Sequence, residues 1–170
     1  MTVRQVGLVG SGIMGSGVAE VVAKAGLDVV LRSRAESSAE AMTTALEKSL
    51  AKQVEKGKLD DAEGAAIRGR VRAVTDLQEL ATCDLVLESV VEDLTVKKQL
   101  FTDLDEICAA AEILATNTST LSVSEIAVTT RRPERVCGIH FFNPAPVMAL
   151  VEVVRAESTA SATIAAARTF

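Results

Sequence analysis

Two acid–base groups stand close together near the C-terminal end of the chain. His140 is the only histidine among the 170 residues, and Glu152 follows it a short way along the chain. An imidazole can gain or lose a proton near neutral pH, and a neighbouring carboxylate can orient the ring and stabilise its charged form. Such a pair could remove the hydroxyl proton of a secondary alcohol while hydride leaves the carbon. Taken alone, a single histidine is more often structural than catalytic.

A glycine-rich turn near the N-terminus indicates a second kind of chemistry. Residues 10–15 read G-x-G-x-x-G between an apolar run and a helical stretch, the context of a dinucleotide-binding turn. Gly10 would allow the tight turn, Gly12 the approach of a pyrophosphate, and Gly15 close packing of helix on strand. The helix N-terminus would offer free N–H groups to the phosphates. The alternative is that these glycines serve only a sharp turn. The predicted turn consists of Gly10, Ser11, Gly12, Ile13, Met14 and Gly15.

The end of the next predicted strand bears on the choice of nicotinamide cofactor. An acidic residue at this position would hydrogen-bond the ribose 2′-hydroxyl of NAD, but the chain has Arg32, Ser33 and Arg34 instead. Two guanidinium groups and a hydroxyl suit a 2′-phosphate. The sequence therefore favours NADP over NAD. The alternative is that both arginines are solvated surface charges and that Glu36 binds the ribose of NAD.

Short β-rich runs alternate with helical patterns along the whole chain. This alternation predicts an α/β fold of the Rossmann type, a doubly wound and mostly parallel sheet with flanking helices. We expect residues 1–155 to form the dinucleotide-binding domain and residues 156–170 to begin a connection to a further domain. The expected strands are 3–9, 27–31, 71–74, 85–91, 112–115, 135–139 and 150–154, and the expected helices are 18–25, 36–56, a stretch near Leu77, 94–110, 123–128 and 158–170.

Composition narrows the class of protein. The formal charge is −5 and no long Lys or Arg run occurs, which argues against a nucleic acid or an anionic membrane as partner. No apolar run is long enough to span a bilayer, so we expect a cytoplasmic protein. Cys83, Cys108 and Cys137 lack the paired spacing of a zinc site. We expect them to be reduced and buried, and we expect no metal.

Several segments together resemble one family, the 3-hydroxyacyl-CoA dehydrogenases, which include 3-hydroxybutyryl-CoA dehydrogenases. The most specific segment is residues 138–148, Gly-Ile-His-Phe-Phe-Asn-Pro-Ala-Pro-Val-Met, followed by Leu-Val-Glu at 150–152. Asn-Thr-Ser at 117–119 is a second signature, and residues 7–17 and 88–97 also match. The resemblance spans nearly the whole chain and implies a Rossmann-type cofactor domain that acts on an acyl-CoA.

The resemblance also implies roles for individual residues. It makes His140 the catalytic acid/base, Glu152 its partner, and Ser119 the group that holds the substrate oxygen. Asn143 would contact the nicotinamide or the substrate oxygen, although Asn-Pro also commonly starts a turn. Further implied contacts are Glu92 and Lys97 with the nicotinamide-side ribose, Asn117 with the nicotinamide ring, and Ser49 and Lys56 with coenzyme A. Glu92 could instead be a solvated charge favoured by a helix dipole, and Lys56 a solvated surface lysine.

The chain departs from the family pattern in two ways. It lacks the acidic ribose ligand at Ser33, and it is shorter than family members, which continue into a helical C-terminal domain. We therefore expect a fragment, of low activity on its own, of a homo-oligomer assembled through that domain. The expected reaction takes a 3-oxoacyl-CoA such as acetoacetyl-CoA to the (S)-3-hydroxyacyl-CoA. Another β-hydroxyacid dehydrogenase, which would use a catalytic lysine, and a non-catalytic nucleotide-binding relative remain alternatives.

Overall fold

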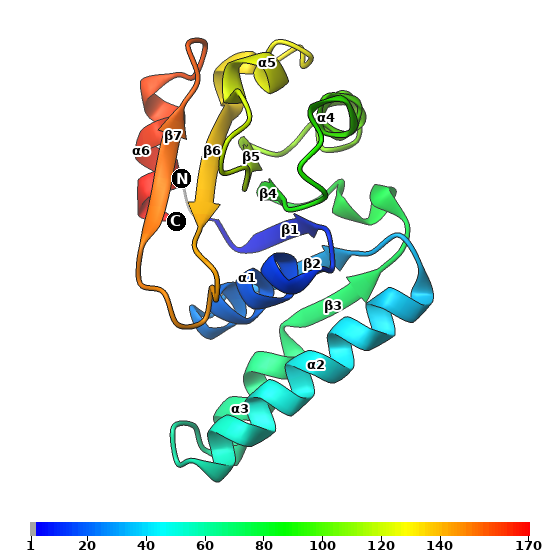
Figure 1. The fold of residues 1–170 in the computed structure, drawn as a ribbon, viewed down its shortest axis with the longest axis vertical. Coiled ribbons are helices and arrows are strands. Elements are labelled where there is room, and N and C mark those ends of the chain that lie inside the picture. The colour runs from blue at the N-terminus through cyan, green and yellow to red at the C-terminus, as the bar shows by residue number, and fades with distance from the viewer. Residues whose placement is uncertain (1–2) are drawn as a thin grey trace.

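The structure, a computed structural model, describes residues 3–170 and is built on one seven-stranded sheet (Figure 1). Helices alternate with the strands, as the sequence predicts. The strands are β1 (Gln5–Val9), β2 (Asp28–Arg32), β3 (Val71–Val74), β4 (Leu85–Glu88), β5 (Ile113–Thr116), β6 (Val136–Phe141) and β7 (Val151–Arg155). The helices are α1 (Ile13–Lys24), α2 (Glu36–Glu55), α3 (Asp61–Gly69), α4 (Leu94–Ile107), α5 (Val123–Ala127) and α6 (Ser161–Thr169), with short 3₁₀ turns η1 (Leu77–Leu80) and η2 (Pro133–Arg135).

The order of the strands confirms the doubly wound fold. Across the sheet the order is β3-β2-β1-β4-β5-β6-β7. The chain moves outward from β1 to β3, then returns so that β4 pairs with the other side of β1. Strands β1 to β6 are parallel, and β7 adds an antiparallel edge. The return creates a switch point at the carboxyl ends of β1 and β4, where open α/β sheets bind their ligands.

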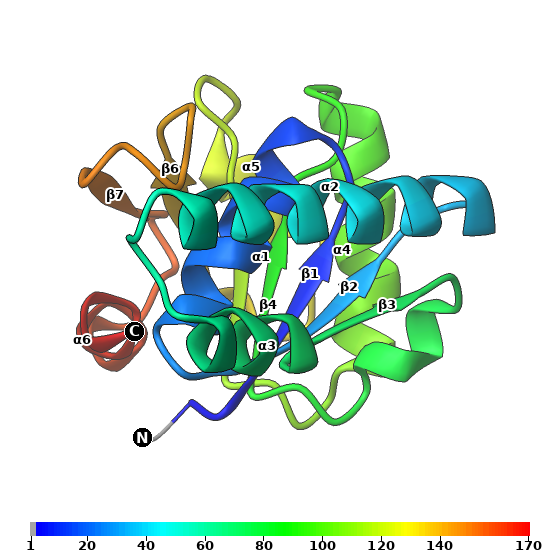
Figure 2. The ribbon, with the colours of Figure 1, turned by 90° about the horizontal axis from the view of Figure 1, so that it is seen from below.

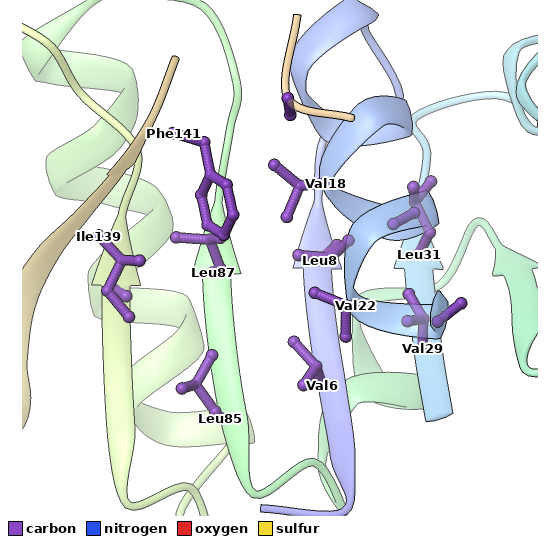
Figure 3. Packing of buried hydrophobic residues seen from close by; sticks show 14 of the residues in the cluster. Val6, Leu8, Val18, Val22, Val29, Leu31, Leu85, Leu87, Ile139 and Phe141 are labelled. Carbon is purple, nitrogen blue, oxygen red and sulfur yellow. The ribbon is translucent and has the colours of Figure 1, made fainter. Parts of the chain in front are cut away.

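Alternate residues of the central strands enter two separate cores. Val6, Leu8, Leu85 and Leu87 point to the face covered by α1, α2, α3 and α6, where Val18 and the other labelled aliphatic side chains interlock (Figures 2 and 3). The intervening strand residues pack with α4, α5 and η1 on the opposite face. Burial on both faces explains why these strands read as continuous apolar runs. The cores hold the strand ends rigidly, so the loops that follow them have a fixed base.

Several elements differ from the sequence predictions. Helix α4 ends at Ile107 and not at residue 110, and α6 spans Ser161–Thr169 and not residues 158–170. Helix α1 begins at Ile13 and not at residue 18. The prediction began too late because the first turns of this helix contain glycines, which have low helix propensity. Strand β4 ends at Glu88, and residues 89–91 belong to the loop after it. Helix α3 was not predicted. It begins with a capping box in which Asp60 accepts the N–H of Glu63 and Glu63 accepts that of Asp60.

The last helix packs against the same sheet. Ile164 and Ala167 of α6 are buried in the core that contains α1. The division of the chain at residue 155 stays a prediction.

The three cysteines are free and buried, as predicted. Burial raises the pKa of Cys83 and of Cys137 to about 12 and that of Cys108 to about 11. Over residues 3–170, no helix combines the length and the apolar character that crossing a membrane would need, and no cluster of three or more potential metal ligands occurs there.

Candidate active site

A cavity of about 820 Å³ lies at the carboxyl ends of the central strands. The turn after β1, the end of β2, the loops after β4 and β5, and the segment after β6 contribute its walls. The sheet topology places its ligand crevice at this same edge. Of the predicted site residues, those that line the cavity are Gly10, Ser11, Gly12, Ile13, Met14, Arg32, Arg34, Glu92, Lys97, Asn117, Ser119, His140 and Asn143.

The three glycines of the turn occupy three different environments. Gly10 has a φ of +116°, and a Cβ there would lie 2.4 Å from the carbonyl oxygen of Ser89. A Cβ on Gly15 would lie 1.8 Å from the carbonyl oxygen of Gly10, so the helix can pack this closely only with glycine. At Gly12 a Cβ would meet nothing within 4 Å, because this residue faces the cavity. The turn is thus closed by two glycines and leaves the third open to a ligand.

The N-terminus of α1 points its free N–H groups at this open space. Gly12 is the N-cap and supplies no side-chain oxygen to these groups, and the first turn contains no acidic residue. The positive end of the helix dipole is therefore uncompensated. Together with the room above Gly12, this arrangement fits the pyrophosphate of a dinucleotide.

The end of β2 presents two arginines in different ways. Arg32 is anchored, because its Nε donates to the carbonyl oxygen of Thr75 at 3.1 Å. Arg34 is exposed and lines the cavity. Ser33 is 1% exposed and does not line the cavity; its hydroxyl is hydrogen-bonded to those of Ser11, at 2.6 Å, and Ser38. The hydroxyls that reach the cavity from this network are therefore those of Ser11 and Ser38.

The alternative ribose ligand lies elsewhere. Glu36 is the first residue of α2 and lines a separate depression with Ala39, Glu40 and Thr75, among others. It is not among the residues that line the main cavity.

His140 and Glu152 form a pair across two strands. They are directly opposite each other in the antiparallel ladder of β6 and β7, and His140 Nδ1 lies 3.0 Å from Glu152 Oε2. His140 is largely buried and its ring lies 4.5 Å from that of Phe142. With Nδ1 held by the carboxylate, the lone pair of Nε2 is left free to accept a proton from a ligand in the cavity.

The loops after β4 and β5 are joined by Glu92. One carboxylate oxygen of Glu92 accepts hydrogen bonds from the hydroxyl of Thr118 and, at 3.1 Å, from the N–H of Ser119, while the other lies 3.3 Å from Lys97 Nζ. Burial acts to raise the pKa of Glu92, but the Thr118 hydrogen bond and the Lys97 charge lower it below its ordinary value. The carboxylate is therefore a built part of the wall and not a freely solvated charge.

Asn117 ties the wall to the histidine strand. Its Oδ1 accepts the N–H of Phe141 at 2.7 Å, and its Nδ2 lies 3.4 Å from Ser89 Oγ. The strand end that carries His140 is thereby held beside the β5 loop. Asn143 is exposed at the cavity rim, next to Pro144.

The two predicted coenzyme A contacts lie away from this cavity. Ser49 is half-buried in α2, and its hydroxyl donates to Glu20 Oε2 at 2.7 Å. Lys56 is the C-cap of α2 and is exposed. Neither residue lines the main cavity.

Comparison with known proteins identifies the family. A family model described as the NAD binding domain of 3-hydroxyacyl-CoA dehydrogenase matches residues 5–170. The chain belongs to this family. A 3-hydroxybutyryl-CoA dehydrogenase from Clostridioides difficile is 46% identical over 156 residues, which is 92% of this chain and 56% of that protein. A 3-hydroxyadipyl-CoA dehydrogenase from Escherichia coli K12 is 46% identical over 164 residues, 95% of this chain and 34% of that protein.

The solved structures agree with this membership. The crystal structure of 3-hydroxybutyryl-CoA dehydrogenase from Escherichia coli K12 has a TM-score of 0.96 and 41% identity, covering 98% of this chain and 35% of that one. The chain spans about half the length of the curated 3-hydroxybutyryl-CoA dehydrogenases that it matches.

Sequence reasoning missed several residues of this 3-hydroxyacyl-CoA dehydrogenase site. Ser38 was not predicted, although it follows the arginines closely, because a serine in the first turn of a helix is common. Glu88 was not predicted because the sequence does not show whether a carboxylate at the end of a strand is buried. The other apolar wall residues also lacked a signal; they are Val9, Val90, Val91, Val96 and Leu100. Phe141 and Phe142, which the sequence indicated as core and pocket wall, do line the cavity.

Proposed function

We propose that this chain is the cofactor-binding part of an oxidoreductase that moves hydride between NADP(H) and C3 of a short 3-hydroxyacyl-CoA or 3-oxoacyl-CoA. The observation that carries the proposal is that His140, which is paired with Glu152, and the glycine turn line one cavity. An acid–base group and a dinucleotide turn in one crevice are the parts that oxidation of an alcohol requires. Family membership and the names of the relatives support the substrate class.

The cofactor would be held by backbone at one end and by side chains at the other. The N–H groups around Gly12 would receive the pyrophosphate, and Glu92 and Lys97 would lie near the nicotinamide-side ribose. Asn117 and Asn143 would face the nicotinamide or the substrate oxygen. When bound, the nicotinamide supplies the hydride acceptor or donor.

The chain's own residues would handle the proton. His140 Nε2 would take the hydroxyl proton of a 3-hydroxyacyl group, or return it to a 3-oxoacyl group, while Glu152 stabilises the charged ring. Ser119, exposed at the cavity wall, would donate a hydrogen bond to the same substrate oxygen. The apolar walls would exclude water from the reacting centre.

The preference for NADP rests on the end of β2. Arg34 is exposed at the cavity, Arg32 lies beside it, and no carboxylate from this strand end lines the cavity. A 2′-phosphate would receive charge-assisted hydrogen bonds from guanidinium and further ones from the hydroxyls of Ser11 and Ser38. With NADP the reduction of a substrate such as acetoacetyl-CoA is the expected direction.

Coenzyme A would contact the chain outside the main cavity. Lys56, exposed at the end of α2, could meet a phosphate, whereas Ser49 would have to release Glu20 to bind a ligand with its hydroxyl. Assembly into a homo-oligomer and a cytoplasmic location complete the proposal.

A titration with NADPH and NADH tests the cofactor site directly. The chain has no Trp and no Tyr, so the fluorescence of the reduced nicotinamide can be followed without interference from Trp or Tyr fluorescence of the protein. We expect tighter and more salt-sensitive binding of NADPH, and a loss of about tenfold in NADPH affinity on Arg34→Ala with little change for NADH. Arg168→Ala, which removes an exposed arginine from α6, is the matched control and should change neither.

The reaction is tested with acetoacetyl-CoA and NADPH. His140→Ala should lower turnover by about 10²- to 10⁴-fold while the nucleotide still binds. Tighter binding of NADH would contradict the preference for NADP but not the proposed reaction. An absence of binding by either nucleotide, or a His140→Ala variant as active as the parent, would refute the proposed function.

A further inference from the structure

The most deeply buried ion pair of the described chain lies directly under the cavity. Lys97 Nζ is 2.5 Å from Glu88 Oε1, and the two side chains are 1% and 0% exposed. Removing a charged pair from water is costly unless each group is fully hydrogen-bonded. Since the interior of the sheet needs no charge to pack, the position of this pair calls for an explanation.

Both oxygens of Glu88 are used to hold the ends of strands and loops. Oε1 also accepts the N–H of Val90 at 2.6 Å, in the loop after β4, and Oε2 accepts the hydroxyl of Thr116 at 2.7 Å, the last residue of β5. The carbonyl oxygen of Glu88 accepts the N–H of Asn117 at 2.8 Å. One buried residue thus fixes the starting points of both loops that line the cavity.

Lys97 continues the network toward the ligand space. It stands in the first turn of α4, where the helix dipole disfavours a positive charge. Its ammonium is shared between Glu88 and, at 3.3 Å, Glu92 Oε2. The charge that could otherwise serve a ligand is therefore largely engaged by two carboxylates.

Glu92 connects Lys97 to the loop after β5. It is 39% exposed in its side chain, but Lys97 holds one oxygen while the other accepts the N–H of Ser119. Without the ammonium, this exposed carboxylate would gain more by turning to water. The backbone of Ser119 would then lose its anchor.

We infer that Glu88 and Lys97 form a positioning pair for the active site. Through Glu92, the pair holds the backbone of Ser119 at the cavity wall, so that the loops after β4 and β5 keep one fixed geometry. In this arrangement Lys97 acts on the carboxylates of Glu88 and Glu92 and not on a phosphate of the cofactor. The inference rests on the proposed function only where it states that Ser119 faces the substrate.

The test measures the Ser119 amide first, because that readout needs no ligand. In the ¹⁵N-labelled chain, Lys97→Met and Glu88→Gln should each lower the hydrogen-exchange protection of the Ser119 amide at least tenfold and weaken NADPH binding by about tenfold. Glu92→Ala, a change in an exposed loop that the fold can tolerate, removes the acceptor of the Ser119 N–H and should reproduce both effects. It tests the last contact of the network if the buried variants do not fold.

Asp105→Asn is the matched control. Asp105 is a buried carboxylate of the same helix α4, paired with Arg132 at 2.8 Å, and does not line the cavity. This variant should lower the melting temperature yet keep the Ser119 protection and the NADPH affinity of the parent. The inference is overturned if Ser119 keeps its protection in Glu92→Ala or in folded Lys97→Met, or if Asp105→Asn loses it equally. A parent chain that binds no nucleotide would refute the proposed function and leave the Ser119 readout intact.

Discussion

His140 and Glu152 face each other across the β6–β7 ladder, with Nδ1 and Oε2 3.0 Å apart. Because a carboxylate can only accept, the neutral ring should carry its proton on Nδ1 and leave Nε2 bare. The sole histidine gives a single pair of ring resonances in ¹⁵N NMR, so the tautomer can be assigned without ambiguity. We expect the Nδ1–H form in the parent chain and a loss of this preference in Glu152→Ala. Glu157→Ala, an exposed residue beyond β7, should leave the tautomer unchanged, and a parent ring protonated on Nε2 would contradict the assignment.

Gly12 and Gly15 should respond differently to the same substitution. Gly15→Ala brings a Cβ to 1.8 Å from the carbonyl oxygen of Gly10, and we expect the free energy of unfolding to fall by about 1–3 kcal/mol or more. Gly12→Ala meets no atom within 4 Å, so its cost should stay below about 1 kcal/mol. The added methyl group occupies the ligand space, however, and NADPH affinity should drop at least tenfold. Urea unfolding and fluorescence titration of both variants check this, and a Gly12→Ala variant with unchanged affinity would speak against pyrophosphate binding at the turn.

The three cysteines should be inert while the chain is folded. Burial raises the pKa of Cys83 and Cys137 to about 12 and that of Cys108 to about 11, and the thiolate is the reactive form. Iodoacetamide at mildly alkaline pH should therefore add nothing to the folded chain and three groups to the unfolded chain, as counted by mass spectrometry. Rapid labelling of any one cysteine under native conditions would show that its part of the core opens.

The arrangement of the sheet was predictable because its strands are buried on both faces and the helices between them are amphipathic. Continuous apolar runs such as β1 and β4 are easily recognised in the sequence. Helix α3 was missed because its apolar residues are few, although Asp60 and Glu63 form a capping box that a search for that motif would find. The late start assigned to α1 has a different cause, since Gly15 and Gly17 lower helix propensity where tertiary packing requires a helix.

The candidate site was predictable only where a motif names its residues. His140 and the glycine turn stand in recognisable strings, and the structure brings them to one cavity. Ser33 was expected at the ligand, but its hydroxyl lies inside a network with Ser11 and Ser38. The buried role of Glu88 had no signal, because it depends on contacts with Lys97 of α4 and Thr116 of β5 that form only in the folded chain. Networks of this kind arise from packing in three dimensions and have no fixed spacing.

The buried carboxylate that joins α1 to α2 should make stability depend on pH. Glu20 accepts hydrogen bonds from Lys24 Nζ at 2.6 Å, Ser49 Oγ at 2.7 Å and Gln53 Nε2 at 2.8 Å. Burial acts to raise the pKa of Glu20, but these hydrogen bonds and the charge of Lys24 outweigh it and lower the pKa below the ordinary value of 4.5. The group therefore binds protons more weakly in the folded chain than in the unfolded one.

The sign of the pH effect follows from that depressed pKa. The network contributes its full stabilisation above the ordinary carboxyl pKa, and this contribution is lost as the pH falls through the folded pKa. Glu20→Gln should cost about 1–3 kcal/mol at neutral pH, and its difference from the parent chain should shrink as the pH falls below the ordinary value of 4.5. Urea unfolding across this range measures the difference, with Glu40→Gln, an exposed residue of α2, as a control that should track the parent throughout. A Glu20→Gln difference that is constant with pH would mean that the carboxylate is not ionised in the folded chain.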